Sequence, residues 1–306
     1  MATTTETATA TNGTKLPSPA ELRASLARDG FVHIPSLLSA DQLETLRAAT
    51  RRLTTAARDG KWPYIRTLPK QFPPWPSDPS HGIWGVQHLL HPSNPDAAVF
   101  VSSYFGDAVM GVCKALLEAT NDALVMELYN LLVRPDADFE LRWHRDDIAA
   151  DAAPEVELER LRKPALHAQW NLALYEDRSL VVVPGSQARA RTEEERAAAP
   201  YEKTLLDMKV VVMKPGDCVF YNNNILHRGV YDSKVERMTL HGSVGLVTGS
   251  KERARNVLQH GIGSWVGQCD FGDLDEGTRR RAEGMRERLV KMGSDAGDVG
   301  YFSKDE

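Results

Sequence analysis

The chain carries its clearest structural signal at residues 215–229, which read PGDCVFYNNNILHRG. The opening Pro215-Gly216-Asp217 is typical of a tight turn, because proline presets one backbone angle and glycine adopts conformations that other residues avoid. The apolar run that follows predicts a buried strand. We expect this strand to emerge at His227, next to Arg228-Gly229, and so to present an imidazole at one edge of a β structure.

Short β-rich segments of the same kind fill the chain from residue 123 onward. Turn signals such as Pro184-Gly185-Ser186 separate them, and no helical crossover links consecutive segments. Because parallel strands need such crossovers, the pattern predicts a mainly β protein with flanking helices, built as an antiparallel sandwich or barrel. The expected strands are residues 124–133, 168–175, 180–183, 209–213, 217–221 and 238–247.

Helices are expected on both sides of these strands. Ser18 and Ser39 are typical helix caps, because each is followed three residues later by Glu or Gln. A short strand at residues 31–34 separates the two helices. Further helices are expected at residues 96–118 and 278–292, the second exposed and charged, and in two polar inserts interpreted as solvated surface helices, residues 149–163 and 188–202.

Residues 60–95 differ from the rest, because prolines are dense there and tryptophans recur among them. Such density excludes regular helix, while the aromatic side chains argue against a solvated linker. We interpret this stretch as a long ordered loop packed across an opening of the core. Its candidate substrate-contacting residues, for which ordinary loop packing is the alternative, are Trp84, Gln87, His88 and His91.

Composition limits the class of protein. The 306 residues include 37 Lys and Arg against 42 Asp and Glu, so the net charge of −5 does not predict nucleic-acid binding. No uninterrupted apolar run is long enough to span a membrane. Three widely separated cysteines favour a reducing compartment, and we expect a cytoplasmic protein. Residues 1–15 are expected to form a disordered tail, and residues 16–306 a single domain.

The sequence Trp143-His144-Arg145-Asp146-Asp147 is the sharpest chemical feature. Imidazole and carboxylate together suit a divalent first-row metal. In extended backbone the side chains of His144 and Asp146 point to the same side, since strand side chains alternate. A hydrogen-bonded pair without a metal is the alternative for this feature on its own.

A barrel would bring His227 to the mouth where His144 and Asp146 lie. Two histidines and one carboxylate on one face of an iron leave neighbouring positions open, as in non-heme Fe(II) oxygenases. Arg237 lies ten residues after His227 and begins the next expected strand. Directed inward, its guanidinium would suit a carboxylate.

Four segments, in order, resemble the phytanoyl-CoA dioxygenase (PhyH) family of Fe(II)- and 2-oxoglutarate-dependent oxygenases. The resemblance runs from about residue 25 to 250, and it implies a double-stranded β-helix, the jelly-roll or cupin-like barrel. Gln187 departs from the His that the family often has after Pro-Gly-Ser, and the loop after Asp146 is long and acidic. The matching segments are DGFVHIPSLLS (29–39), WHRD (143–146), LVVVPGS (180–186), and HRG (227–229) with Arg237.

The resemblance implies that His144, Asp146 and His227 bind Fe(II) and that Arg237 pairs with the distal carboxylate of 2-oxoglutarate, with O2 as the second co-substrate. Trp170 and Asn130 are further candidates for contact with 2-oxoglutarate. Their alternatives are an ordinary core tryptophan and a cross-strand amide pair. Arg145, beside the metal ligands, is a substrate candidate, with an exposed basic rim as the alternative.

The implied reaction oxidises a small organic molecule by hydroxylation, desaturation or related chemistry, and it releases succinate and CO2. A secondary metabolite is compatible with the Trp- and Pro-rich wall. Two alternatives are a cupin-like metalloenzyme that does not use 2-oxoglutarate, and a catalytically silent relative that binds a metal or ligand. Arg237 favours the oxygenase. No nucleic acid or membrane partner is expected, and the sequence is compatible with a homo-oligomer.

Overall fold

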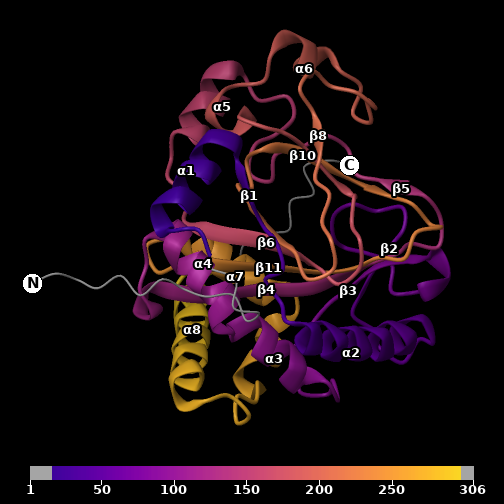
Figure 1. Ribbon diagram of the computed structural model, residues 1–306, viewed down its shortest axis with the longest axis vertical. Helices are drawn as coiled ribbons and strands as arrows, with labels where there is room; N and C mark the ends of the chain where they lie inside the picture. Colours follow the sequence, from indigo (N-terminus) through magenta and orange to yellow (C-terminus); the bar gives the residue numbers. More distant parts are fainter. Residues whose placement is uncertain (1–15, 298–306) are drawn as a thin grey trace, which may run out of the picture.

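The computed structural model describes residues 16–297, so the expected N-terminal tail lies outside the described residues. Its strands form two antiparallel sheets (Figure 1). The strands are β1 Phe31–Ile34, β2 Ile65–Thr67, β3 Ile83–Val86, β4 Leu124–Val133, β5 Phe139–Glu140, β6 His167–Ala173, β7 Leu180–Val183, β8 Lys209–Val210, β9 Cys218–Tyr221, β10 Leu226–Tyr231 and β11 Met238–Leu246. The helices are α1 Pro19–Asp29, α2 Ala40–Arg58, α3 Ala97–Phe105, α4 Asp107–Leu117, α5 Pro154–Leu161, α6 Glu193–Ala197, α7 Lys251–Gln259 and α8 Glu276–Ser294.

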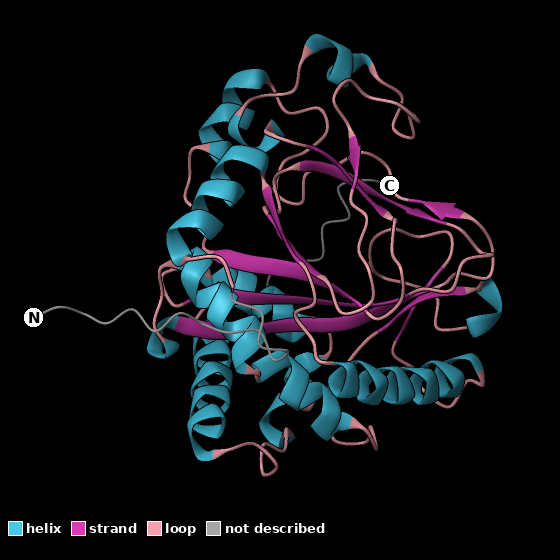
Figure 2. Ribbon diagram, viewed as in Figure 1, coloured by secondary structure: helices cyan, strands magenta, loops and turns pink. Residues whose placement is uncertain are grey.

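The seven-stranded sheet has the order β1-β9-β6-β11-β4-β3-β2, and the four-stranded sheet has the order β5-β10-β7-β8. Figure 2 shows the helices α2, α3, α4 and α8 on one side of the large sheet and the small sheet on its other side. This is the two-sheet barrel with flanking helices that the strand pattern predicts. We therefore expect the candidate metal ligands His144, Asp146 and His227 to lie between the two sheets.

The side chains of strand β6 alternate between the helices on one side of the large sheet and the barrel interior on the other. Its even-numbered residues face the helices: Trp170 is fully buried there and packs against the rings of Tyr104 and Tyr129. Its odd-numbered residues Gln169 and Asn171 face the barrel interior. The predicted contact between Trp170 and 2-oxoglutarate is therefore wrong, because alternation along the strand turns this ring away from the interior.

The predicted helix at residues 96–118 is two helices. Gly106 adopts an extended conformation between α3 and α4 and breaks the helical path. By length and composition the segment Ala97–Leu117 is apolar enough to span a membrane, and half of its most apolar part is buried inside the protein. Phe100, Tyr104 and Phe105 belong to the main hydrophobic core, so this apolarity serves the packing of the helices against the sheet.

The polar inserts are anchored, which corrects their interpretation as solvated surface helices. Glu157 of α5 is fully buried and accepts hydrogen bonds from the guanidinium groups of Arg145, Arg191 and Arg196. Arg145 also donates to the backbone carbonyl of Ser186. Arg145 is thus a buried structural residue rather than a substrate contact or an exposed rim, because its charge is satisfied inside this cluster.

Helix α8 also differs from expectation, because it is amphipathic rather than simply exposed. Ala282, Met285 and Leu289 on one face are buried in the main core. The proline-rich stretch contains the two short strands β2 and β3, which extend the large sheet, and a short 3-10 helix at Pro79–His81. Several of its aromatic residues line the pocket between the sheets, as the loop interpretation predicts.

Candidate metal centre and its pocket

Three side chains from two parts of the chain meet at one end of the barrel. His227 is the second residue of β10, and His144 forms an isolated antiparallel bridge with it. Oδ1 of Asp146 lies 3.5 Å from Nε2 of His144 and 3.6 Å from Nε2 of His227. The three ligand atoms all lie within 4.8 Å of one another, which is the spacing that a single metal ion requires.

The sequence pattern predicts that the strand after the Pro215-Gly216 turn ends at His227. This prediction is wrong. That strand, β9, ends at Tyr221, and the turn at residues 222–224 leads into β10, which belongs to the other sheet. The reversal brings the imidazole back over the barrel opening. This turn also supplies the carbonyl of Asn223 to the backbone N–H of Asp146, so it helps to fix the carboxylate as well.

Both histidines are oriented by their own backbone. Nδ1 of His144 lies 2.7 Å from the carbonyl of Arg142, and Nδ1 of His227 lies 2.8 Å from the carbonyl of Ile225. A carbonyl only accepts, so each Nδ1 carries the proton and each Nε2 keeps a free lone pair directed at Asp146. This arrangement fixes the tautomer that a metal-binding histidine needs.

The carboxylate is held in its charged form. Burial alone would raise the pKa of Asp146, but the neighbouring imidazoles of His144 and His227 and the hydrogen bond from Gln169 outweigh it and keep the pKa below its usual range. Nε2 of Gln169 donates to the other carboxylate oxygen at 3.1 Å. Burial lowers the pKa of His227 to about 4. One carboxylate and two imidazoles that bind through Nε2 form a ligand set that suits Fe(II).

The metal ligands open onto a cavity of about 220 Å³ between the sheets. Arg237 also lines this cavity. Its Nε donates to Asp177 at 2.9 Å, and its guanidinium packs 4.4 Å above the ring of Tyr231. Nη1 of Arg237 is buried and has no hydrogen-bond partner in the protein. A buried donor without a partner is costly, so this atom favours an anionic ligand in the cavity.

The other predicted residues divide between two places. Trp84 lines the cavity. Gln87, His88 and His91 do not; His88 binds the carbonyl of His260, and His91 packs against the ring of Trp62. These three residues follow the end of β3, and their contact with substrate stays a prediction.

Asn130 is not among the residues that line the cavity, but it contacts Arg66, which is. Asn130 is buried, and its amide oxygen, in the orientation that satisfies its neighbours, accepts from Nη2 of Arg66 at 2.9 Å. The sequence analysis missed Arg66, Gln169 and Asp177. Gln169 could have been found from the sequence, because alternation along β6 makes its side chain face the interior. The roles of Arg66 and Asp177 depend on contacts with residues distant in sequence.

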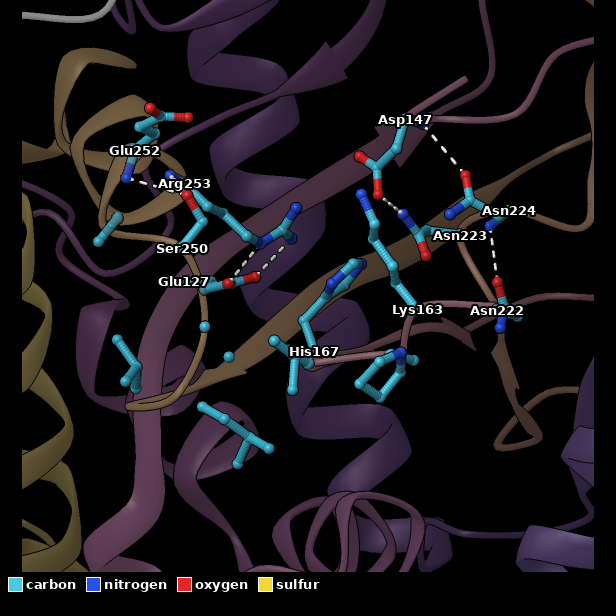
Figure 3. Close-up of a pocket in the computed structure, with 18 of the residues that line it drawn as sticks. Glu127, Asp147, Lys163, His167, Asn222, Asn223, Asn224, Ser250, Glu252 and Arg253 are labelled. Carbon is cyan, nitrogen blue, oxygen red and sulfur yellow. Dashed lines mark hydrogen bonds and ion pairs between the residues drawn. The ribbon is translucent and has the colours of Figure 1, made fainter. Parts of the chain in front are cut away.

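A second and larger cavity of about 1020 Å³ lies beyond Gln169 and is lined mainly by polar side chains (Figure 3). Glu127 and Arg253 form a two-pronged ion pair on one side, and Asp147 accepts from Asn223 on the other. His167 projects between these groups, and its buried Nε2 has no hydrogen-bond partner in the protein. The inward face of β6 thus runs from His167 past Gln169 into the smaller cavity.

A two-sheet barrel carrying two histidines and a carboxylate at one end defines the class of mononuclear non-heme iron oxygenases. The chain belongs to the phytanoyl-CoA dioxygenase (PhyH) family, whose model matches residues 26–231. No curated protein sequence matches the chain. Fe(II) and 2-oxoglutarate are therefore its cofactor and co-substrate, and the triad above is the iron site.

Several solved structures have the same fold. EctD from S. alaskensis with 2-oxoglutarate and 5-hydroxyectoine has a TM-score of 0.54 and 20% identity, covering 76% of this chain and 78% of its own. AviO1 from Streptomyces viridochromogenes Tue57 has a TM-score of 0.53 and 20% identity, with coverages of 76% and 96%. HygX from Streptomyces hygroscopicus with nickel, 2-oxoglutarate and hygromycin B has a TM-score of 0.53 and 15% identity, with coverages of 74% and 86%.

Proposed function

We propose that this protein oxidises a C–H bond of a small organic molecule, a secondary metabolite, by hydroxylation, desaturation or related chemistry, with release of succinate and CO2. The observation that carries the proposal is the triad His144, Asp146 and His227 opening onto the same cavity as Arg237. The relatives with hygromycin B and 5-hydroxyectoine bound support a small molecule as substrate.

The chain's own residues have three tasks in this reaction. The two Nε2 atoms and the Asp146 carboxylate would hold the iron. Bound Fe(II) supplies the activation of O2 and the oxidative decarboxylation of 2-oxoglutarate. Arg237 binds the distal carboxylate of 2-oxoglutarate through its unpartnered Nη1, while Asp177 keeps the guanidinium in place through Nε. This division assigns opposite ends of the co-substrate to opposite ends of the cavity.

Aromatic side chains exclude water from the cavity. Phe72 lies edge-on to the ring of His144, and Tyr221 lies edge-on to the ring of His227. Trp84 and Tyr231 enclose the end occupied by Arg237. Exclusion of water strengthens the charge interactions there and protects reactive species from side reactions.

The larger cavity of Figure 3 suits the substrate. It is several times larger than the cavity that holds Arg237, and it is lined by Asp147, the chain neighbour of the iron-binding Asp146, and by Asn223. The unpartnered Nε2 of His167 favours a substrate with hydroxyl or amine groups. A His167→Phe variant is expected to raise the substrate KM by about tenfold or more, with the affinity for 2-oxoglutarate unchanged. Equal KM values in steady-state assays would refute this assignment.

Anaerobic spectroscopy tests the function directly. Addition of Fe(II) and 2-oxoglutarate without O2 is expected to give a visible charge-transfer band, because the keto acid chelates the iron. No band with the wild-type protein would contradict the proposed function. The Arg237→Ala variant is expected to need about ten- to a hundredfold more 2-oxoglutarate for half-maximal band intensity, since a charge-assisted hydrogen bond is lost. An unchanged affinity would refute only the role of Arg237.

In the cupin-like alternative the same triad works without 2-oxoglutarate, so this alternative predicts no charge-transfer band in the wild-type protein. It leaves the buried and unpartnered Nη1 of Arg237 without an explanation. A panel of candidate metabolites, screened for stimulated succinate formation with product masses read in parallel, then identifies the substrate.

A further inference from the structure

Arg66 reaches the cavity of the iron site from an unexpected place. It belongs to β2, the outermost strand of the large sheet, and pairs in register with Gly85 of β3. A Cβ atom at Gly85 would lie 2.9 Å from Cδ of Arg66 and 3.2 Å from its Cγ. The absence of a side chain at Gly85 therefore lets Arg66 pass across β3 and extend over the sheet as far as Asn130 of β4.

The surroundings of the Arg66 guanidinium hold it in place without neutralising it. The group lies 5.0 Å above the ring of Trp75 and 5.4 Å from the ring of Trp84, and one nitrogen donates to the Asn130 amide. Its Nε is buried and has no hydrogen-bond partner. Among residues 16–297 no carboxylate lies within ion-pair distance of it.

The charges that line the cavity are consequently unbalanced. Of its three arginines, Arg237 pairs with Asp177 and Arg228 pairs with Glu140 at 3.3 Å. Arg66 alone has no acidic partner in the described part of the chain. Burial lowers its pKa to about 10, so it is still a cation at neutral pH. A buried cation of this kind requires an anion for compensation.

Arg66 and Arg237 are positioned over one continuous group of aromatic rings. Arg237 lies over Tyr231 and Arg66 lies over Trp84, and the centroids of these two rings are 6.0 Å apart. Both guanidinium groups therefore stack on neighbouring rings and line the same cavity. A single carboxylate between them would receive hydrogen bonds from both.

We propose that Arg66 is a second binding residue for the distal carboxylate of 2-oxoglutarate and, with Arg237, makes the site select a 2-oxo dicarboxylate over a 2-oxo monocarboxylate. The proposal rests on the proposed function. Gly85 and the two tryptophans act as positioning residues for this guanidinium. Pyruvate, which has the chelating end and no distal carboxylate, should gain nothing from Arg66.

Calorimetric titration of the Ni(II)-loaded protein with 2-oxoglutarate and with pyruvate tests this assignment without turnover. The Arg66→Gln variant is expected to raise the Kd for 2-oxoglutarate by about tenfold or more and to leave the Kd for pyruvate within about twofold. Gly85→Ala, which displaces Arg66 and keeps its charge, is expected to act in the same direction. Arg51→Gln is the matched control, because Arg51 is an exposed arginine beside the Tyr175 ring.

The outcomes separate this proposal from the function on which it rests. Wild-type protein that binds Ni(II) but not 2-oxoglutarate would overturn the proposed function. Wild-type binding with an unchanged Kd in folded Arg66→Gln protein would overturn the role of Arg66 alone. Equal weakening for 2-oxoglutarate and pyruvate would also overturn it, because a loss of cavity structure acts on both ligands. Circular dichroism and Tm show that each variant is folded.

Discussion

At the residue scale, the site depends on which atom of each side chain is already engaged. His144 and His227 use Nδ1 for backbone carbonyls, and this leaves Nε2 for the metal. Asp146 uses one oxygen for Gln169 and directs the other between the imidazoles. Hydrogen bonds to groups outside the ligand set thus decide how the ligands point, which sequence spacing alone does not specify.

Removal of a ligand is expected to abolish activity and leave the fold nearly intact. Asp146→Ala and His227→Ala should reduce succinate formation by more than about a hundredfold. Mutation of residues that only orient the metal ligands already costs about 10- to 100-fold in metal proteins. The main core contains neither side chain, so Tm should shift little. His81→Ala, at an exposed histidine, is the control. Wild-type succinate formation by either variant would show that the iron site is elsewhere.

At the element scale, regular strands were the most predictable part of the fold. β4 and β7 have the bounds that their apolar runs indicate, and β1 likewise. The polar inserts were less predictable, because charge alone does not distinguish a solvated helix from one that is anchored. Glu157 looks like an ordinary helical glutamate in the sequence, yet three arginines from distant positions surround it.

Loss of the Glu157 charge is expected to destabilise the protein. Glu157→Gln leaves several buried guanidinium groups without their carboxylate, which costs about 3–5 kcal/mol when a buried pair is broken. The free energy of unfolding, measured in urea, should fall by that order. Glu159→Gln on the same helix is the matched control, because its side chain is 74% exposed. Equal stabilities of the two variants would show that the cluster contributes nothing.

At the scale of the whole molecule, the part of the chain after β11 contacts the proline-rich stretch (residues 60–95) through His88. Its Nε2 donates to the carbonyl of His260 at 2.7 Å, and its Nδ1 accepts from the indole N–H of Trp265. The second contact requires the neutral ring, because a protonated Nδ1 cannot accept a hydrogen bond. Burial lowers the pKa of His88 to about 4, against about 6.5 in an unfolded chain.

Acid is therefore expected to destabilise the protein through this residue. Between pH 6.5 and 4 the unfolded chain binds a proton at His88 that the folded protein does not, so the free energy of unfolding falls as the pH falls. The contribution is about 1.4 kcal/mol per pH unit at most. His88→Gln should reduce the slope of stability against pH in urea unfolding series. An identical slope would refute this assignment.

The sequence by itself indicated most of the strands, the metal ligands and the family, because strands depend on local alternation and the ligands lie in short motifs. Only the tertiary structure decided that Trp170 faces the helices, that Arg145 is buried in an ionic cluster, and that Arg66 crosses Gly85 to reach the iron site. The physical reason is that a polar side chain takes its role from its partners. Those partners lie far away in sequence and meet only when the two sheets pack.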